Sequence, residues 1–125
     1  FGTAAGDQVK YIEIGSENPN IIYLNQQPAS GNLGKLWKTT DGGITWNLLT
    51  IPAGNSRRML LTLDPANDNH LFIAYPSGSN GNKTFESTDG GTSFTNITTN
   101  VLNNESVQSL LTIGLCLTRF SHRND

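Results

Sequence analysis

The chain has 125 residues, a formal net charge of -2 at pH 7 and one cysteine, Cys116. This length suits one ordinary domain. The weak acidic charge excludes a broad basic surface for nucleic acid or an anionic membrane, and one cysteine cannot form a disulfide within the chain. No apolar run approaches the roughly 20 residues that span a bilayer. The sequence starts at Phe1 without a signal-peptide pattern, so we expect a mature or excised piece of a protein.

Short segments with the features of β-strands follow one another along the chain. They are rich in β-branched and aromatic residues and are bounded by Gly, Pro, Asn or Asp. In chain order they are 9–14, 21–26, 35–40, 45–50, 58–63, 70–75, 83–87 and 93–98. Because no segment has sustained helical periodicity, the sequence predicts an all-β protein.

The predicted strands belong to a repeat with a period of about 48 to 50 residues. Residues 14–23 align with 63–72 at an offset of 49, and Asp41 aligns with Asp89 at an offset of 48. Each repeat contains four predicted strands. Four antiparallel strands per unit at this period are typical of β-propeller blades.

A third copy of the repeat begins where 110–113 aligns with 60–63. After this point the sequence reads GLCLTRFSHRND and leaves the repeat pattern, as a truncation, an alternative reading frame or an artificial chain end would produce. The sequence therefore predicts a partial propeller with two complete antiparallel four-stranded blades and the start of a third. We assign the partial propeller to 1–125, its complete blades to 9–50 and 58–98, and its incomplete blade to 106–125.

One motif occurs once in each complete repeat, between the third and fourth predicted strands. The copies read TTDGGITW in the first repeat and STDGGTSF in the second. In a tight loop of this kind a carboxylate can accept several backbone N–H groups that lack a strand partner. A Thr or Ser hydroxyl adds a further bond, and a glycine allows positive φ at no steric cost. The aromatic residue then covers the loop, so each motif is interpreted as a hairpin clasp.

The two motifs resemble the Asp-box, also called the BNR repeat, Ser/Thr-x-Asp-x-Gly-x-Thr/Ser-Trp/Phe. The matching residues are Thr39, Asp41, Gly43, Thr45, Trp46, Ser87, Asp89, Gly91, Ser93 and Phe94. Over about 9–113 the chain is similar to Asp-box propellers of sialidases, xyloglucanase-type glycoside hydrolases, sortilin-type sorting receptors and large secreted Bacteroidetes-type proteins. The resemblance implies a structural motif on the face away from any ligand, and a secreted, extracellular or periplasmic protein.

Loops on the opposite face of such a propeller would carry any ligand site. These loops, 26–34, 51–57, 76–82 and 99–106, contain amides, hydroxyls and small residues suited to a sugar or a peptide. The candidate ligand-face residues are Gln26, Gln27, Arg57 and Tyr75.

A complete catalytic site is not expected in these loops. Their one carboxylate is Glu105, whereas glycoside hydrolysis needs two carboxylates about 5 to 10 Å apart. A sialidase-like site also needs an arginine cluster for the substrate carboxylate. Arg57 and Arg58 are adjacent, so in a strand they point to opposite sides. The catalytic residues, if the parent protein has any, stay unknown.

Other residue groups have simpler interpretations. The turn 64–69 has oxygen atoms that could meet a calcium ion, but it lacks the Gly and Glu spacing of an EF-hand, so ordinary turn chemistry is favoured. His70 is interpreted as an edge histidine beside that turn, and Cys116 as a free thiol. We expect no metal and no cofactor.

Two functions stay open. The first is a non-catalytic structural or ligand-binding fragment of a secreted Asp-box propeller. The second is part of a carbohydrate-active glycoside hydrolase, sialidase- or xyloglucanase-like, whose catalytic residues lie outside this chain. Two blades alone would expose apolar faces and open strand edges. The expected partners are therefore the remaining blades of a parent protein or a second copy, with a carbohydrate or protein as ligand, and neither nucleic acid nor membrane insertion.

Overall fold

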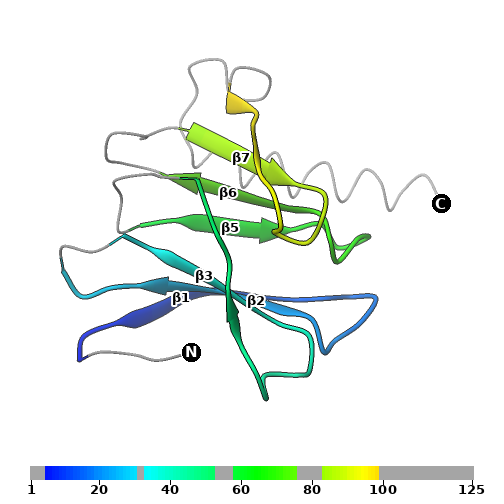
Figure 1. The fold of residues 1–125 in the computed structure, drawn as a ribbon, viewed down its shortest axis with the longest axis horizontal. Coiled ribbons are helices and arrows are strands. Elements are labelled where there is room, and N and C mark those ends of the chain that lie inside the picture. The colour runs from blue at the N-terminus through cyan, green and yellow to red at the C-terminus, as the bar shows by residue number, and fades with distance from the viewer. Residues whose placement is uncertain (1–4, 31–32, 53–57, 76–82, 99–125) are drawn as a thin grey trace.

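The computed structural model describes residues 5–30, 33–52, 58–75 and 83–98. These residues form two antiparallel four-stranded sheets, in which each strand pairs with the next along the chain (Figure 1). The first sheet contains β1 (Gln8–Ile14), β2 (Ile22–Gln27), β3 (Lys35–Thr39) and β4 (Asn47–Leu48). The second contains β5 (Leu60–Leu63), β6 (Leu71–Tyr75), β7 (Lys83–Ser87) and β8 (Thr95–Asn96). The predicted all-β class with antiparallel four-stranded sheets is confirmed, while 106–125 lies outside the described residues.

The fourth strand of each sheet is shorter than the sequence predicted. β4 and β8 have two residues each, whereas segments of six were expected at 45–50 and 93–98. The reason is local: the backbone N–H groups of Thr45 and Ser93 donate to aspartates in the preceding loops and not to a neighbouring strand. The first residues of each predicted strand therefore belong to the loop that precedes it.

The core lies between the two sheets. Strand pairing places Leu61, Ile73 and Phe85 in one row across the second sheet. This row packs with buried side chains of the first sheet, among them Tyr23 and Leu36. Since side chains alternate between the two faces of a strand, each sheet uses one face for this core and turns the other away from it.

The other face of the first sheet is exposed along its two edge strands, β1 and β4. Its register aligns Ile12 with Leu24, Leu24 with Trp37, and Trp37 with Leu48. We call Ile12, Ile14, Leu24, Trp37 and Leu48 the outer face of the first sheet. Ile12 and Ile14 are each 57% exposed and Leu48 is 54% exposed, whereas Leu24 is buried and Trp37 is half-buried. The apolar side chains of the two edge strands are therefore the part of this face that is open to solvent.

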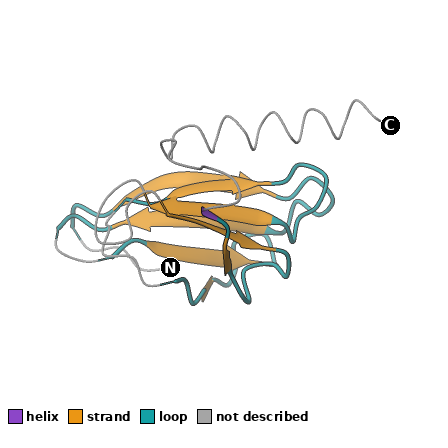
Figure 2. Ribbon diagram, turned by 90° about the horizontal axis from the view of Figure 1, so that it is seen from above, coloured by secondary structure: helices purple, strands orange, loops and turns teal. Residues whose placement is uncertain are grey.

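The loops gather at the two ends of the sheets (Figure 2). At one end of the first sheet, the β1–β2 turn meets the β3–β4 loop, where the Gly42 N–H donates to the Asn20 carbonyl over 3.0 Å. The second sheet repeats this contact between Gly90 and Asn69 over 2.9 Å. Within the described ranges, the structure contains no helix long and apolar enough to cross a membrane.

Candidate functional site

The first site is the loop that follows β3. Asp41 Oδ1 accepts the Thr39 hydroxyl over 2.7 Å and the Thr45 N–H over 2.9 Å. Asp41 Oδ2 accepts the Thr45 hydroxyl. The Thr39 oxygen in turn accepts the Gly43 N–H over 2.9 Å, and the Trp46 indole N–H donates to the Gly43 carbonyl over 3.0 Å. Both carboxylate oxygens are therefore engaged within the loop.

The loop that follows β7 has the same pattern. Asp89 Oδ1 accepts the Ser87 hydroxyl over 2.8 Å and the Ser93 N–H over 2.9 Å, and Oδ2 accepts the Ser93 hydroxyl. The Ser87 oxygen accepts the Gly91 N–H over 2.8 Å, and Phe94 packs against the core. We call the segments 39–46 and 87–94 the Asp loops.

The hydrogen bonds of the Asp loops decide the charge of their aspartates. Bonds from the Thr45 side chain and backbone, followed by Thr39, lower the pKa of Asp41 to about 2. Bonds from Ser93, followed by Ser87, lower the pKa of Asp89 to about 2. A general acid of a glycosidase needs a raised carboxyl pKa. The pKa of each Asp-loop aspartate is therefore shifted in the direction opposite to that of a general acid.

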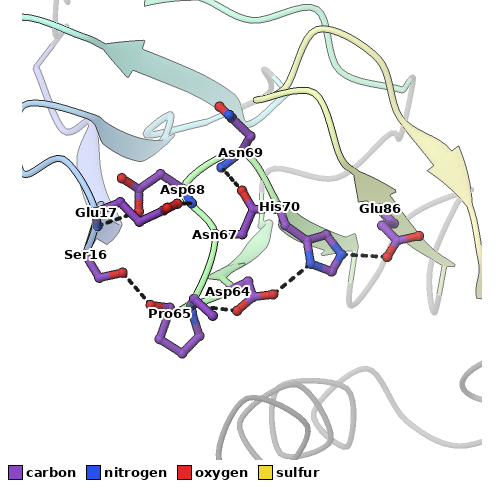
Figure 3. A network of polar contacts seen from close by, with 10 residues as sticks. Ser16, Glu17, Asp64, Pro65, Asn67, Asp68, Asn69, His70 and Glu86 are labelled. Carbon is purple, nitrogen blue, oxygen red and sulfur yellow. Dashed lines mark hydrogen bonds and ion pairs between the residues drawn. The ribbon is translucent and has the colours of Figure 1, made fainter. Parts of the chain in front are cut away.

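The second site is the contact between two turns of neighbouring sheets (Figure 3). We call 15–21 the first turn and 64–70 the second turn. Asp68 of the second turn is only 3% exposed. Its carboxylate accepts the Glu17 N–H over 3.2 Å and the Asn18 N–H over 2.7 Å. The Asp68 N–H donates to Glu17 Oε1 over 3.0 Å, and the Tyr23 hydroxyl donates to the Asp68 carbonyl over 2.7 Å.

A lysine adds a second polar connection between the sheets. Lys38 of β3 donates from Nζ to the Gly90 carbonyl over 3.0 Å. The same ammonium lies 5.2 Å from the centroid of the Tyr23 ring, within the range of a cation–π interaction. Burial lowers the pKa of Lys38, although the charge of Asp89 opposes this shift.

The third site is a histidine between two carboxylates at the same end of the second sheet. His70 Nδ1 lies 2.9 Å from Asp64 Oδ2, and Nε2 lies 2.7 Å from Glu86 Oε2. The imidazole ring also contacts Phe72, with centroids 4.8 Å apart. We call Asp64, His70 and Glu86 the histidine bracket. Among the described residues, no group of three or more His, Cys, Asp or Glu side chains is arranged to hold a metal ion.

Two of the candidate ligand-face residues, Gln26 and Tyr75, lie at the end of the strands opposite the Asp loops. Gln26 is buried, donates to Asp7 over 2.9 Å and accepts the Trp37 indole N–H over 2.8 Å. Tyr75 is also buried, and its hydroxyl donates to the Pro52 carbonyl over 2.7 Å. Burial raises the pKa of Tyr75 to about 12.

The remaining candidate ligand-face residues are less enclosed or not described. Gln27 is half-buried at the end of β2, and Arg57 and Glu105 lie outside the described residues. A ligand role for these residues stays a prediction.

Sequence reasoning missed the histidine bracket and the reach of Asp68 across the sheets. A signal for the bracket exists in the repeat. The positions of Asp64, His70 and Glu86 are occupied by Gly15, Ile21 and Lys38 in the first repeat, at offsets of 49, 49 and 48. A histidine and two carboxylates thus replace three residues that cannot form the same cluster.

The fold and the Asp loops define an all-β protein with sheets of the propeller-blade type. A scan against protein-family models gave no match, and a search of the curated proteins gave none. Among solved structures, the chain is similar to a GH74 enzyme of Niastella koreensis, with 26% sequence identity and a TM-score of 0.51. The similarity covers 70% of this chain and 14% of the enzyme chain. It supports a propeller-type relationship to a part of that enzyme.

Proposed function

We propose that the chain is a non-catalytic, structural or ligand-binding part of a secreted Asp-box β-propeller, and that its two sheets are neighbouring blades. The observation that carries this proposal is the outer face of the first sheet. This apolar face recurs in the second sheet, where it is covered.

The repeat supplies the correspondence between the two faces. Leu61 and Leu63 of the second sheet align with Ile12 and Ile14 of the first at an offset of 49. Leu61 is 1% and Leu63 is 8% exposed, because they pack in the core between the sheets. Ile12 and Ile14 are each 57% exposed. The equivalence supports a further layer on the first sheet, formed by another blade of the parent protein or by a second copy of this chain.

Self-association of the isolated chain tests this role. Apolar surface is worth about 25 cal/mol per Å2 when it leaves water, so we expect copies to associate through the outer face. Ile12→Lys combined with Ile14→Lys should give a monomer in sedimentation velocity, because each lysine must stay hydrated. The matched control is Ile44→Lys in the first Asp loop, where Ile44 is 85% exposed, and it should associate like the parent. A monomeric parent chain with a cooperative unfolding transition would count against the proposal.

The proposal of a non-catalytic role rests on three of the described carboxylates. Asp41 and Asp89 have both oxygens engaged and a pKa of about 2, and Asp68 is bonded to the first turn. Turnover of a sialoside or of a β-glucan by the purified chain, abolished by one carboxylate substitution, would overturn this role.

A second candidate function follows from the similarity to the GH74 enzyme. On this alternative the chain is part of a carbohydrate-active glycoside hydrolase, and its ligand-face residues only bind the substrate. Titration of a xyloglucan oligosaccharide into the chain separates a ligand-binding role from a purely structural one. Binding that is weakened by Gln27→Ala or Arg57→Ala is the result that the hydrolase part requires, whereas the absence of binding favours a structural role.

A further inference from the structure

The histidine bracket requires two donors on one imidazole ring. Each ring nitrogen of His70 lies within hydrogen-bond distance of a carboxylate, 2.9 Å from Asp64 and 2.7 Å from Glu86. An ionised carboxylate only accepts hydrogen bonds, and a neutral imidazole has a single N–H. Only the protonated ring can donate to both carboxylates. On deprotonation one nitrogen would present a lone pair to a carboxylate oxygen.

The bracket joins both ends of the second turn to a different strand. Asp64 and His70 occupy the two ends of this turn, where the Asp64 N–H donates to the His70 carbonyl over 2.9 Å. Glu86 belongs to β7, next to β6 in the sheet. Protonated His70 therefore closes the base of the second turn through its bond to Asp64 and fixes this base to β7 through its bond to Glu86. Both hydrogen bonds are charge-assisted, which makes them stronger than neutral ones.

The tip of the same turn makes the contact with the first sheet. Asp68 lies between Asp64 and His70 in the chain and accepts the N–H groups of Glu17 and Asn18. Figure 3 shows the bracket and the Asp68 contact on opposite sides of this one turn. Because the turn has only seven residues, a change in the hydrogen bonds of His70 at its base can alter the position of Asp68 at its tip.

We propose that the histidine bracket is a proton-operated latch, in which protonation of His70 secures the second turn and tightens its Asp68 contact with the neighbouring sheet. The latch goes beyond a blade's structural role because it makes the connection between two sheets depend on pH.

The first repeat provides an internal comparison for the latch. Its turn has the same closing backbone bond, from the Gly15 N–H to the Ile21 carbonyl over 2.8 Å. It has neither a histidine nor a carboxylate at the positions of Asp64, His70 and Glu86. A turn of this shape therefore forms without the bracket, so what the bracket adds is the dependence on protonation.

The charges around the ring set the direction of the effect. In the described part of the chain, Asp64 faces the ring from the end of β5, Glu86 faces it from β7, and the contact from β6 is the uncharged Phe72. Burial lowers the pKa of His70, but the hydrogen bonds and charges of Glu86 and Asp64 outweigh it, so the pKa is raised. The latch is fully closed below the ordinary histidine pKa of about 6.5. It opens as the pH rises through the higher pKa of the folded state.

Nuclear magnetic resonance of the full chain tests the latch. The ring resonances of His70 and the backbone amides of Glu17 and Asn18 are followed during one pH titration, with His122→Gln used to assign the second histidine. We expect the two amides to shift with the same midpoint as the His70 ring, at a pH above the ordinary histidine value. His70→Gln should remove that step from the amide titration.

A pair of matched charge variants completes the test. Glu86→Gln should lower the His70 midpoint, whereas Glu13→Gln, the same change on β1, should leave it in place. If His70→Gln fails to fold, the parent chain and this pair still decide the outcome. The latch is overturned if the His70 midpoint is at or below the ordinary value, or if the Glu17 and Asn18 amides do not follow it.

Discussion

Replacing Asp68 by alanine is the most informative single change in the contact between the sheets. The side chain is almost fully buried, and both its oxygens accept backbone N–H groups from the other sheet, over 3.2 Å and 2.7 Å. Alanine has no side-chain hydrogen-bond acceptor. In the variant, the backbone N–H groups of Glu17 and Asn18 can therefore bond only to water.

The expected loss follows from the number and kind of bonds. A hydrogen bond to a charged group contributes about 1.5 to 3 kcal/mol. Because Glu17 and Asn18 are exposed, water offsets part of the loss, and two bonds together should be worth about 2 to 4 kcal/mol. That is a large share of the roughly 5 to 15 kcal/mol that stabilises a domain.

Urea unfolding followed by tryptophan fluorescence measures this loss as a change in the free energy of unfolding. The matched control is Ser16→Ala, which removes an exposed hydroxyl bonded to the Pro65 carbonyl at the same contact and should cost about 1 kcal/mol or less. If Asp68→Ala unfolds within about 0.5 kcal/mol of the parent, a value below one ordinary hydrogen bond, the reasoning is refuted.

Two further predictions concern the Asp loops. Gly91→Ala should destabilise the chain more than Gly43→Ala. Both glycines have positive φ, 88° at Gly91 and 96° at Gly43. An added Cβ at Gly91 would lie 2.5 Å from Leu49 Cδ1, whereas the atom nearest to an added Cβ at Gly43 is 3.5 Å away. Equal melting temperatures of the two variants would contradict this. In the second, Asp41→Asn and Asp89→Asn should melt below the parent at neutral pH. This difference should shrink as the pH falls from about 4, the ordinary Asp pKa, to about 2, the pKa of both aspartates in the folded chain. The reason is that the ionised carboxylate stabilises the fold, and this stabilisation is lost as the aspartate becomes protonated. A difference that is constant with pH would rule out the ionised clasp.

The strands were predictable from the sequence because alternation and turn residues are local signals. The repeat length then predicted four antiparallel strands for each sheet, whereas the register of their pairing is seen only in the structure. The ends of β4 and β8 were not predictable by the same means, since Thr45 and Ser93 were placed in strands by their neighbours but bond to aspartates within their loops.

The polar contacts divide in the same way. The bonds of the Asp loops join residues two to four positions apart, so the motif alone could suggest them. His70 and Glu86 are 16 positions apart and meet only because β6 and β7 pair in one register. Asp68 reaches residues 50 and 51 positions away, on another sheet. Its turn was foreseeable, and its partners were not.

The central claim is that the outer face of the first sheet packs against a further layer, which is another blade of the parent protein or a second copy of this chain. Isoleucine-methyl spectra of the full chain, recorded on dilution from millimolar to micromolar protein, test it most directly. We predict that the methyl resonances of Ile12 and Ile14 shift with concentration, while those of exposed Ile44 and buried Ile73 stay constant. Ile12 and Ile14 resonances that are unchanged across the dilution, in a chain that remains folded, would contradict the claim.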